Sequence, residues 1–353
     1  MTKITLIMIV NSEYFPEKTV KNKLKNTVYD FEIIFINNNS SEISDDLLNL
    51  SIDDSRVLIK ELDENNLMQT LNNAIEEANG KYIVFTNSLH ILSDDTLKRA
   101  YNKSLDKSAN ILMFNQDNEE TTIISRLVGE KTFKYDKIKD YLFKIDFSLH
   151  NFIYEKEYLI RNNLTFNPIK NNDIKVFAYK TIIKADNLIF FDKQLNHKSQ
   201  NNVDLRDYLD NLEEIQNLIY LEHDEKLKKD VNNFRINESI KKYESTNIVS
   251  KKENFTTLRR NFIKIIQSEN SEEFINTLTK TNRKLLEQVI ISDSVEEYEL
   301  LKKVSEDKNY VNYMKRYEKI LQVEHKKISN FNKSLTSSNS WKLTKFLRII
   351  EKV

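Results

Sequence analysis

Cysteine is absent from this sequence of 353 residues, which has only two glycines and two prolines. Without cysteine the chain forms neither disulfides nor thiolate metal sites. The shortage of glycine leaves much of the turn formation to asparagine, which tolerates left-handed backbone better than most residues. An excess of charge is lacking too, because 54 basic residues balance 54 acidic ones. That balance argues against general nucleic-acid binding, which is typical of basic proteins.

Long apolar runs are also missing. No stretch approaches the roughly 20 apolar residues of a membrane-spanning helix, and the N-terminal residues lack a basic-then-apolar signal pattern. We therefore expect a cytoplasmic protein. The length predicts one large domain and a second, smaller one.

Short apolar runs alternate with helical patterns in the first half of the chain. Continuous runs at residues 4–10, 31–36 and 82–85 predict strands buried on both faces, and residues 57–62 predict a further strand. Residues 67–78 predict a helix that ends near Gly80, and another helix follows Ser93. Polar loops follow the strands. This order predicts an α/β fold with a mostly parallel sheet, whose ligands bind at the carboxyl ends of the strands.

Four blocks carry a family resemblance. Residues 79–97, "NGKYIVFTNSLHILSDDTL", resemble the strand and metal-binding loop of family 2 glycosyltransferases. Residues 3–13, 30–41 and 64–80 resemble the first strand with its loop, the second strand, and the following helix of that family, in the same order. The resemblance implies a GT-A (Rossmann-like) domain.

The resemblance also implies a set of donor-binding residues. Asn37 and Asn38 stand where the family has two acids that hold the uracil or ribose, and an amide oxygen can accept the same hydrogen bonds. Residues 188–202 resemble the last strand and tail, with two basic residues near the donor phosphates. The full donor-binding set is Val10, Asn11, Glu13, Asn37, Asn38, Asn72, Asn87, His197 and Lys198.

Two further family motifs are altered. The usual Asp-x-Asp is replaced by Asn87, Ser88 and Leu89, followed by His90, and Leu71 replaces an arginine beside the retained Asn72. Mg²⁺ and Mn²⁺ prefer anionic oxygen ligands, so we expect no standard metal site and assign no metal ligand. The five histidines lack zinc-like spacing.

Residues 163–177 resemble the acceptor-side segment, which in the family carries Glu-Asp before an apolar helix. Asn172 and Asp173 occupy that place. The resemblance implies that Asp173 is the general base that deprotonates an acceptor hydroxyl in an inverting transfer. Its position equally allows a second interpretation, in which Asp173 caps the helix through Phe177 and Tyr179.

The second half of the sequence changes character. Amphipathic helices are predicted at residues 205–220, 225–243, 255–267, 274–289 and 295–326. We predict a GT-A domain at 1–203, a helical domain at 204–334 that offers a surface for a protein partner, and a basic amphipathic tail at 335–353. The stretch between Trp341 and Lys352 has one basic and one apolar side, which fits peripheral contact with an anionic membrane. Packing on the helical domain is the alternative.

Two functions of different classes remain open. The first is a family 2-like glycosyltransferase that transfers a sugar from a nucleotide-sugar donor to a glycan acceptor hydroxyl, in surface-glycan or wall-polymer assembly. The second is a catalytically inactive GT-A pseudoenzyme that serves as a scaffold or partner subunit. Fold alone does not distinguish them.

Overall fold

A computed structural model describes residues 3–10, 31–37, 45–62, 66–86, 94–116, 118–145, 147–170, 173–194, 203–268 and 270–304. The chain forms two compact units, Met1–Leu286 and Glu287–Val353. The α/β part and the first helices after it therefore share one unit. The domain boundaries expected at 203/204 and 334/335 stay a prediction.

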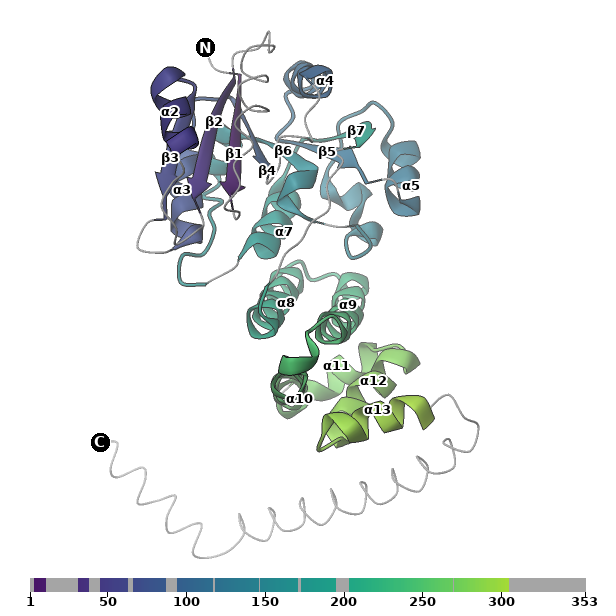
Figure 1. The fold of residues 1–353 in the computed structure, drawn as a ribbon. Helices are drawn as coiled ribbons and strands as arrows, with labels where there is room; N and C mark the ends of the chain where they lie inside the picture. The colour runs from purple at the N-terminus through teal and green to yellow at the C-terminus, as the bar shows by residue number, and fades with distance from the viewer. Residues whose placement is uncertain are drawn as a thin grey trace, which may run out of the picture. The chain divides into compact units, whose positions relative to one another are not determined.

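Within the described ranges, seven strands form one mixed sheet (Figure 1). They are β1 (Ile4–Val10), β2 (Phe31–Asn37), β3 (Val57–Glu61), β4 (Tyr82–Thr86), β5 (Ile111–Asn115), β6 (Phe152–Glu155) and β7 (Leu188–Gln194). Their order across the sheet is β3-β2-β1-β4-β6-β5-β7. Only β6 runs antiparallel to its neighbours β4 and β5. The mostly parallel α/β fold and the strands predicted from apolar runs are confirmed.

Helices connect these strands. They are α2 (Asp45–Asp53), α3 (Leu67–Glu77), α4 (Asp94–Asp106), α5 (Glu119–Val128), α6 (Lys156–Arg161) and α7 (Ile174–Lys184), with 3-10 turns at Tyr135–Lys137, Lys139–Tyr141 and Leu149–Asn151. The predicted helices at α3, α4 and α7 are confirmed. Helices α2, α5 and α6 and strand β6 were not predicted.

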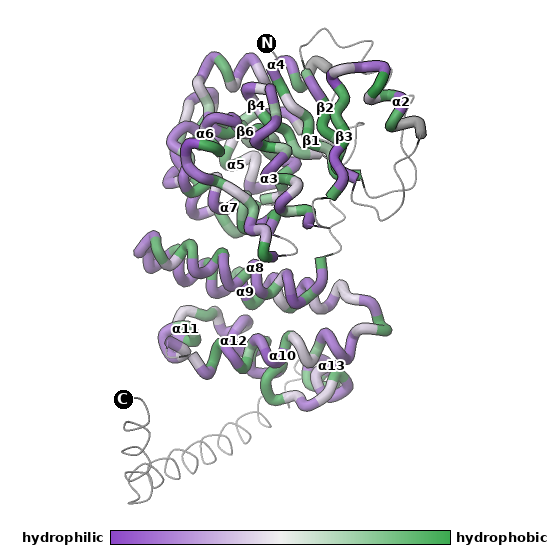
Figure 2. The backbone as a smooth tube through the Cα atoms, turned by 90° about the vertical axis from the view of Figure 1, so that its left-hand side faces the viewer, coloured by the Kyte–Doolittle hydropathy of each residue, from purple (hydrophilic) through white to green (hydrophobic). Residues whose placement is uncertain are grey.

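The sheet is buried on both faces, as the continuous apolar runs require. In β1, Ile7 and Ile9 belong to a core cluster that also contains side chains of α3 and α7. Leu6 and Met8 point to the opposite face, whose cluster includes Ala100 of α4. Figure 2 shows the hydrophobic colour along β1 and β2. Each face of β1 is therefore covered by core side chains.

A buried carboxylate joins three segments at one end of the sheet. Glu32 of β2 accepts hydrogen bonds from Thr5 Oγ1 at 2.6 Å, from Asn79 N at 2.5 Å and from Asn79 Nδ2 at 2.9 Å. Thr5 Oγ1 in turn accepts from Gly80 N at 2.9 Å. The segment before β4 is therefore held against β1.

Gly80 is needed here for space. The C-cap of α3 is Ala78, so the helix ends near Gly80 as expected. A Cβ atom at Gly80 would lie 2.6 Å from the Ile4 carbonyl carbon and closer still to the Thr5 nitrogen. The close approach of the residue 79–81 segment to the β1 backbone is the physical reason for glycine at this position.

The second half is helical. Its elements are α8 (Leu205–Tyr220), α9 (Glu225–Glu244), a 3-10 turn at Ile248–Ser250, α10 (Lys251–Gln267), α11 (Ser271–Thr277), α12 (Lys280–Ile291) and α13 (Val295–Val304). In Figure 2, α8 and α9 alternate between hydrophilic and hydrophobic colours, as expected for amphipathic helices. The predicted tail at 335–353, and residues 305–326 of the last predicted helix, lie outside the described residues.

The single helix expected at 274–289 is wrong. The chain breaks between α11 and α12, where Leu278 has an extended ψ of 144°. Thr279 Oγ1 accepts a hydrogen bond from Asn282 N at 3.2 Å, and Thr279 N donates to Asn233 Oδ1 at 2.8 Å. These bonds satisfy groups that a helix terminus leaves unpaired, which makes the break stable.

No helix within the described ranges is long and apolar enough to span a membrane.

Candidate functional site

The carboxyl ends of β1 and β2 bring two predicted donor-binding residues together. Val10 and Asn37 are the last residues of their strands and are register partners in the parallel ladder. Both are half-buried. Ligands of open α/β sheets bind at such strand ends. The remaining predicted donor residues, apart from Asn72, lie outside the described part of the chain: Asn11, Glu13, Asn38, Asn87, His197 and Lys198.

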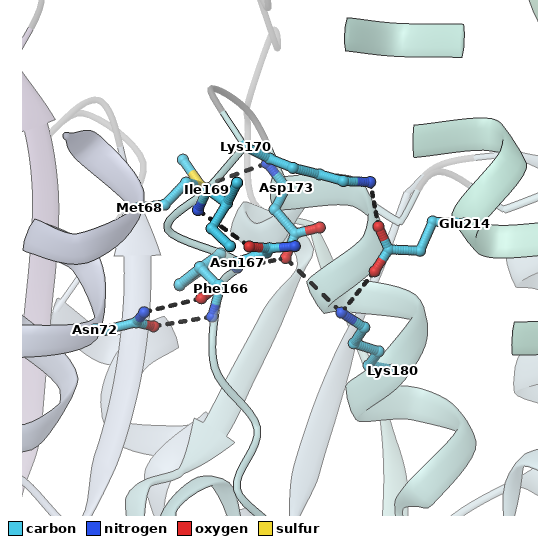
Figure 3. A network of polar contacts seen from close by, with 9 residues as sticks. All are labelled: Met68, Asn72, Phe166, Asn167, Ile169, Lys170, Asp173, Lys180 and Glu214. Atoms are coloured by element: carbon cyan, nitrogen blue, oxygen red, sulfur yellow. Dashed lines mark hydrogen bonds and ion pairs between the residues drawn. The ribbon is translucent and has the colours of Figure 1, made fainter. Parts of the chain in front are cut away.

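The Asn72 side chain forms hydrogen bonds to the backbone of another segment of the protein. Its Nδ2 donates to the Phe166 carbonyl at 2.9 Å, and its Oδ1 accepts from Phe166 N at 2.8 Å (Figure 3). The side chain is buried on α3. This pairing ties α3 to the segment that leads to Asp173. The donor contact implied for Asn72 stays a prediction that competes with this structural role.

Replacement of Asn72 by alanine is expected to lower the free energy of unfolding by about 2–4 kcal/mol. The change leaves the buried N–H and C=O of Phe166 without their partner, and each unsatisfied group costs about 1–3 kcal/mol. Urea denaturation measures the effect, with the exposed helical Asn102→Ala as control. Unchanged stability combined with weaker UDP binding would instead place Asn72 at the donor.

Asp173 lies at the centre of a buried polar network (Figure 3). Its carboxylate has no exposed surface, and Oδ2 accepts a hydrogen bond from Asn167 N at 2.8 Å. Lys180 Nζ is 3.9 Å from the same oxygen. The Asp173 N–H donates to the Met68 sulfur at 3.3 Å. Among the described residues, Oδ1 has no hydrogen-bond partner. One oxygen is thus held in place, and the other can accept a proton.

The environment favours the protonated form of Asp173. Burial raises the pKa of its carboxyl, and the nearby Glu214 carboxylate raises it too. The Asn167 N–H and the cations of Lys180 and Lys170 act in the opposite direction but do not cancel the effect of burial. A raised pKa makes an aspartate a stronger base near neutral pH.

Asp173 stands at the N-cap position of α7, as the helix-cap interpretation expects, but its side chain does not cap the helix. The residue is the N-cap of α7, and its carbonyl accepts from Phe177 N at 2.9 Å. Its carboxylate makes no capping hydrogen bond. The side chain is therefore not explained by helix capping.

Of the altered family positions, the structure describes Leu71 but not the loop at residues 87–90. Leu71, which replaces the family arginine, is fully buried in the core between α3 and the sheet. The loop that replaces Asp-x-Asp, residues 87–90, lies outside the described ranges. Within those ranges, no group of three acidic, histidine or cysteine side chains could hold a metal ion. We assign no residue to a metal and derive no step through one.

Three charged neighbours of Asp173 were not identified from the sequence. Lys180 follows Asp173 by seven residues, which is the spacing of one face of a helix, so this neighbour had a local signal. Lys170 and Glu214 had none. Glu214 lies on α8 and meets α7 only through tertiary packing, where its carboxylate pairs with both lysines.

Comparisons with known proteins agree with this fold. Residues 6–161 match the family model described as glycosyl transferase family 2. None of the curated proteins matches the chain. Among solved structures, S. aureus TarS 1–349 superimposes with a TM-score of 0.59 at 13% identity, covering 86% of this chain and 91% of that chain.

Two further TarS 1–349 structures contain nucleotides. The complex with UDP-GlcNAc has a TM-score of 0.58 at 13% identity and covers 86% of this chain and 92% of that chain. The complex with UDP has a TM-score of 0.59 at 14% identity, with 86% and 91% covered. At these identities the likeness shows a common fold. The expected GT-A-like fold, with helices after the sheet domain, is confirmed.

Proposed function

Because residues 6–161 form a family 2 glycosyltransferase-like domain, we propose that the protein transfers a sugar from a nucleotide-sugar donor to an acceptor hydroxyl. The observation that carries the proposal is the buried Asp173 carboxylate, with one oxygen fixed by Asn167 N and the other without a described partner. The nucleotide complexes of TarS support a UDP-sugar as the donor. We place the reaction in surface-glycan or wall-polymer assembly.

The proposed transfer is a single inverting displacement. Asp173 takes the proton of the acceptor hydroxyl, and the acceptor oxygen forms a bond to the anomeric carbon of the donor sugar. The bond from that carbon to the diphosphate breaks, and the nucleoside diphosphate leaves with the electron pair. One carboxylate suffices, because the donor brings its own leaving group. Since Asp173 has no exposed surface, the acceptor reaches it only after a rearrangement that opens the site.

Calorimetric titration tests donor binding. We expect UDP and UDP-sugars to bind the full chain, and CDP-glycerol to bind more weakly, because the nucleotides seen in the TarS structures are uridine diphosphates. Each titration is run with and without Mn²⁺. Binding that requires Mn²⁺ would show that the chain supplies metal ligands, at positions to which we assign none. Absence of binding to all three nucleotide classes contradicts the proposal.

The second candidate is a GT-A scaffold without activity. The observation in its favour is that Leu71 and Asn72, two family site positions on α3, are used in packing and in backbone pairing. This alternative predicts that no nucleotide binds and that the helices from α8 onward contact a protein partner. The same titrations separate it from the enzyme.

A further inference from the structure

Glu214 connects the two segments that flank Asp173. Its Oε1 accepts from Lys180 Nζ of α7 at 3.0 Å, and its Oε2 pairs with Lys170 Nζ in the loop before Asp173. Figure 3 shows both lysines reaching Glu214 from opposite sides of the aspartate. All three side chains are half-buried, so their charges are less screened than at a fully exposed surface.

Lys180 is shared between two carboxylates. Its Nζ is 3.0 Å from Glu214 Oε1 and 3.9 Å from Asp173 Oδ2. The shorter contact is with Glu214, so Glu214 keeps the ammonium group from closing on Asp173. A Lys180–Asp173 contact closer than 3.9 Å would stabilise the carboxylate further and weaken it as a base.

We propose that Glu214 of α8 is a positioning residue for Asp173, because it holds Lys170 and Lys180 around the carboxylate and keeps the Lys180 charge at a fixed distance. The functional part of this inference rests on the proposed function, in which Asp173 is the base. It gives the first helix after the sheet domain a role in the chemistry, beyond attachment.

A purely structural ion pair offers a matched comparison. Lys175 of α7 lies 3.5 Å from Glu238 of α9, in another bridge between α7 and the helices that follow the sheet domain. Glu238 is not among the groups that act on Asp173. Glu238→Gln and Glu214→Gln thus make the same chemical change in two similar bridges, of which only one faces Asp173.

The charges around Asp173 determine in which direction each substitution should shift its pKa. Lys170, Lys180 and the Asn167 N–H favour its carboxylate, while Glu214 disfavours it. In Glu214→Gln a negative charge is lost and Lys180 is released toward Asp173, and both effects lower the pKa of Asp173. In Lys180→Gln a positive charge is lost, which raises the pKa.

The experiment titrates the Asp173 carboxyl in the full chain by ¹³C NMR after aspartate labelling, with the resonance assigned by its loss in Asp173→Asn. We expect a downward pKa shift in Glu214→Gln, an upward shift in Lys180→Gln, and no shift in Glu238→Gln. Lys180→Arg retains the charge and should restore the wild-type titration. If Glu214→Gln fails to fold, Glu214→Asp replaces it, because its shorter side chain keeps the charge but withdraws from Lys180; a wild-type titration of Asp173 in that variant would overturn the positioning role.

Equal titrations of Asp173 in Glu214→Gln and Glu238→Gln would overturn the positioning role. The acid limb of kcat/KM against pH, measured as UDP release from UDP-GlcNAc, should move with the NMR pKa. If Asp173→Asn remains fully active, the proposed base is wrong, while the NMR shifts still decide whether Glu214 controls Asp173. The two failures are therefore distinguishable.

Discussion

Replacement of Asp173 by asparagine is expected to lower turnover by about 10²–10⁴-fold, the usual contribution of a general base. The amide keeps the size of the carboxylate, and its oxygen can still accept from Asn167 N, so the local geometry is preserved. It cannot take a proton from the acceptor hydroxyl. The measurement is steady-state release of UDP from UDP-GlcNAc with extracted wall polymer as acceptor.

The same substitution should not destabilise the protein at neutral pH. Burial raises the pKa of Asp173 in the folded state, so its ionisation opposes folding once the pH exceeds the pKa of the unfolded chain, and opposes it in full above the folded pKa. Removal of the charge should leave the free energy of unfolding at pH 7 unchanged or larger. The difference should shrink as the pH falls from the folded pKa toward about 3.9, the ordinary aspartate pKa, and vanish below it, because the wild-type residue is then neutral in both states.

A matched control is Asp186→Asn, which makes the same change at an exposed residue paired with Lys134. It should affect neither turnover nor stability by much, since exposed ion pairs contribute little. Activity of Asp173→Asn equal to that of Asp186→Asn would remove Asp173 from the mechanism.

Replacement of Gly80 by alanine is expected to lower the free energy of unfolding by about 3 kcal/mol, at the upper end of ordinary overpacking costs. The added methyl group would overlap the backbone of residues 4 and 5 in β1. Backbone atoms of a central strand cannot turn away as a flexible side chain can. Relief requires moving β1 from the Glu32–Asn79 network, which also costs buried hydrogen bonds. Urea denaturation monitored by far-UV circular dichroism measures the loss.

Two variants test whether the loss of stability comes from overlap of the added methyl group with the β1 backbone. Lys81→Ala, at the exposed neighbouring position, should cost less than about 1 kcal/mol. Thr5→Ala combined with Gly80→Ala should not rescue stability, because the Ile4 carbonyl carbon and Thr5 nitrogen remain in place. Rescue by Thr5→Ala would show that the Thr5 hydroxyl, rather than the backbone, excludes the methyl group.

Strands that are buried on both faces could be predicted from the sequence, whereas strand β6 could not. The apolar runs of β1, β2 and β4 have no polar alternation, which is typical of central parallel strands. Strand β6 has four residues and owes its conformation to β4 and β5, which come from distant parts of the chain. Such non-local pairing leaves no periodic signal.

Helix α5 had a local signal that was overlooked. Asn118 accepts from Thr121 N as its N-cap, Glu119 and Glu120 occupy its first turn, and Gly129 is its C-cap. This combination is a standard pair of helix boundaries. The break between α11 and α12 also had a local signal, because residues 279–284 contain no apolar side chain and interrupt the apolar period.

The candidate site was predicted in part. The resemblance pointed to Asp173 and to the strand ends at Val10 and Asn37. The fold places Val10 and Asn37 next to each other at the carboxyl ends of β1 and β2. It could not show that the Asn72 amide is occupied by the Phe166 backbone. Glu214 follows Asp173 by 41 residues, and only the packing of α8 on α7 brings the two together. Contacts of this kind depend on tertiary structure alone.

Strand β6 has a consequence for the order in which the protein is made. Strands β1 to β4 pair with one another within residues 4–86, and β5 pairs with β7, but only β6 contacts both β4 and β5. Synthesis proceeds from the N-terminus, so a nascent chain that ends before residue 152 lacks β6, the strand that joins β5 to the first four among the described residues. The ribosome must release residues up to Gln194 before the sheet beside Asp173 can be complete.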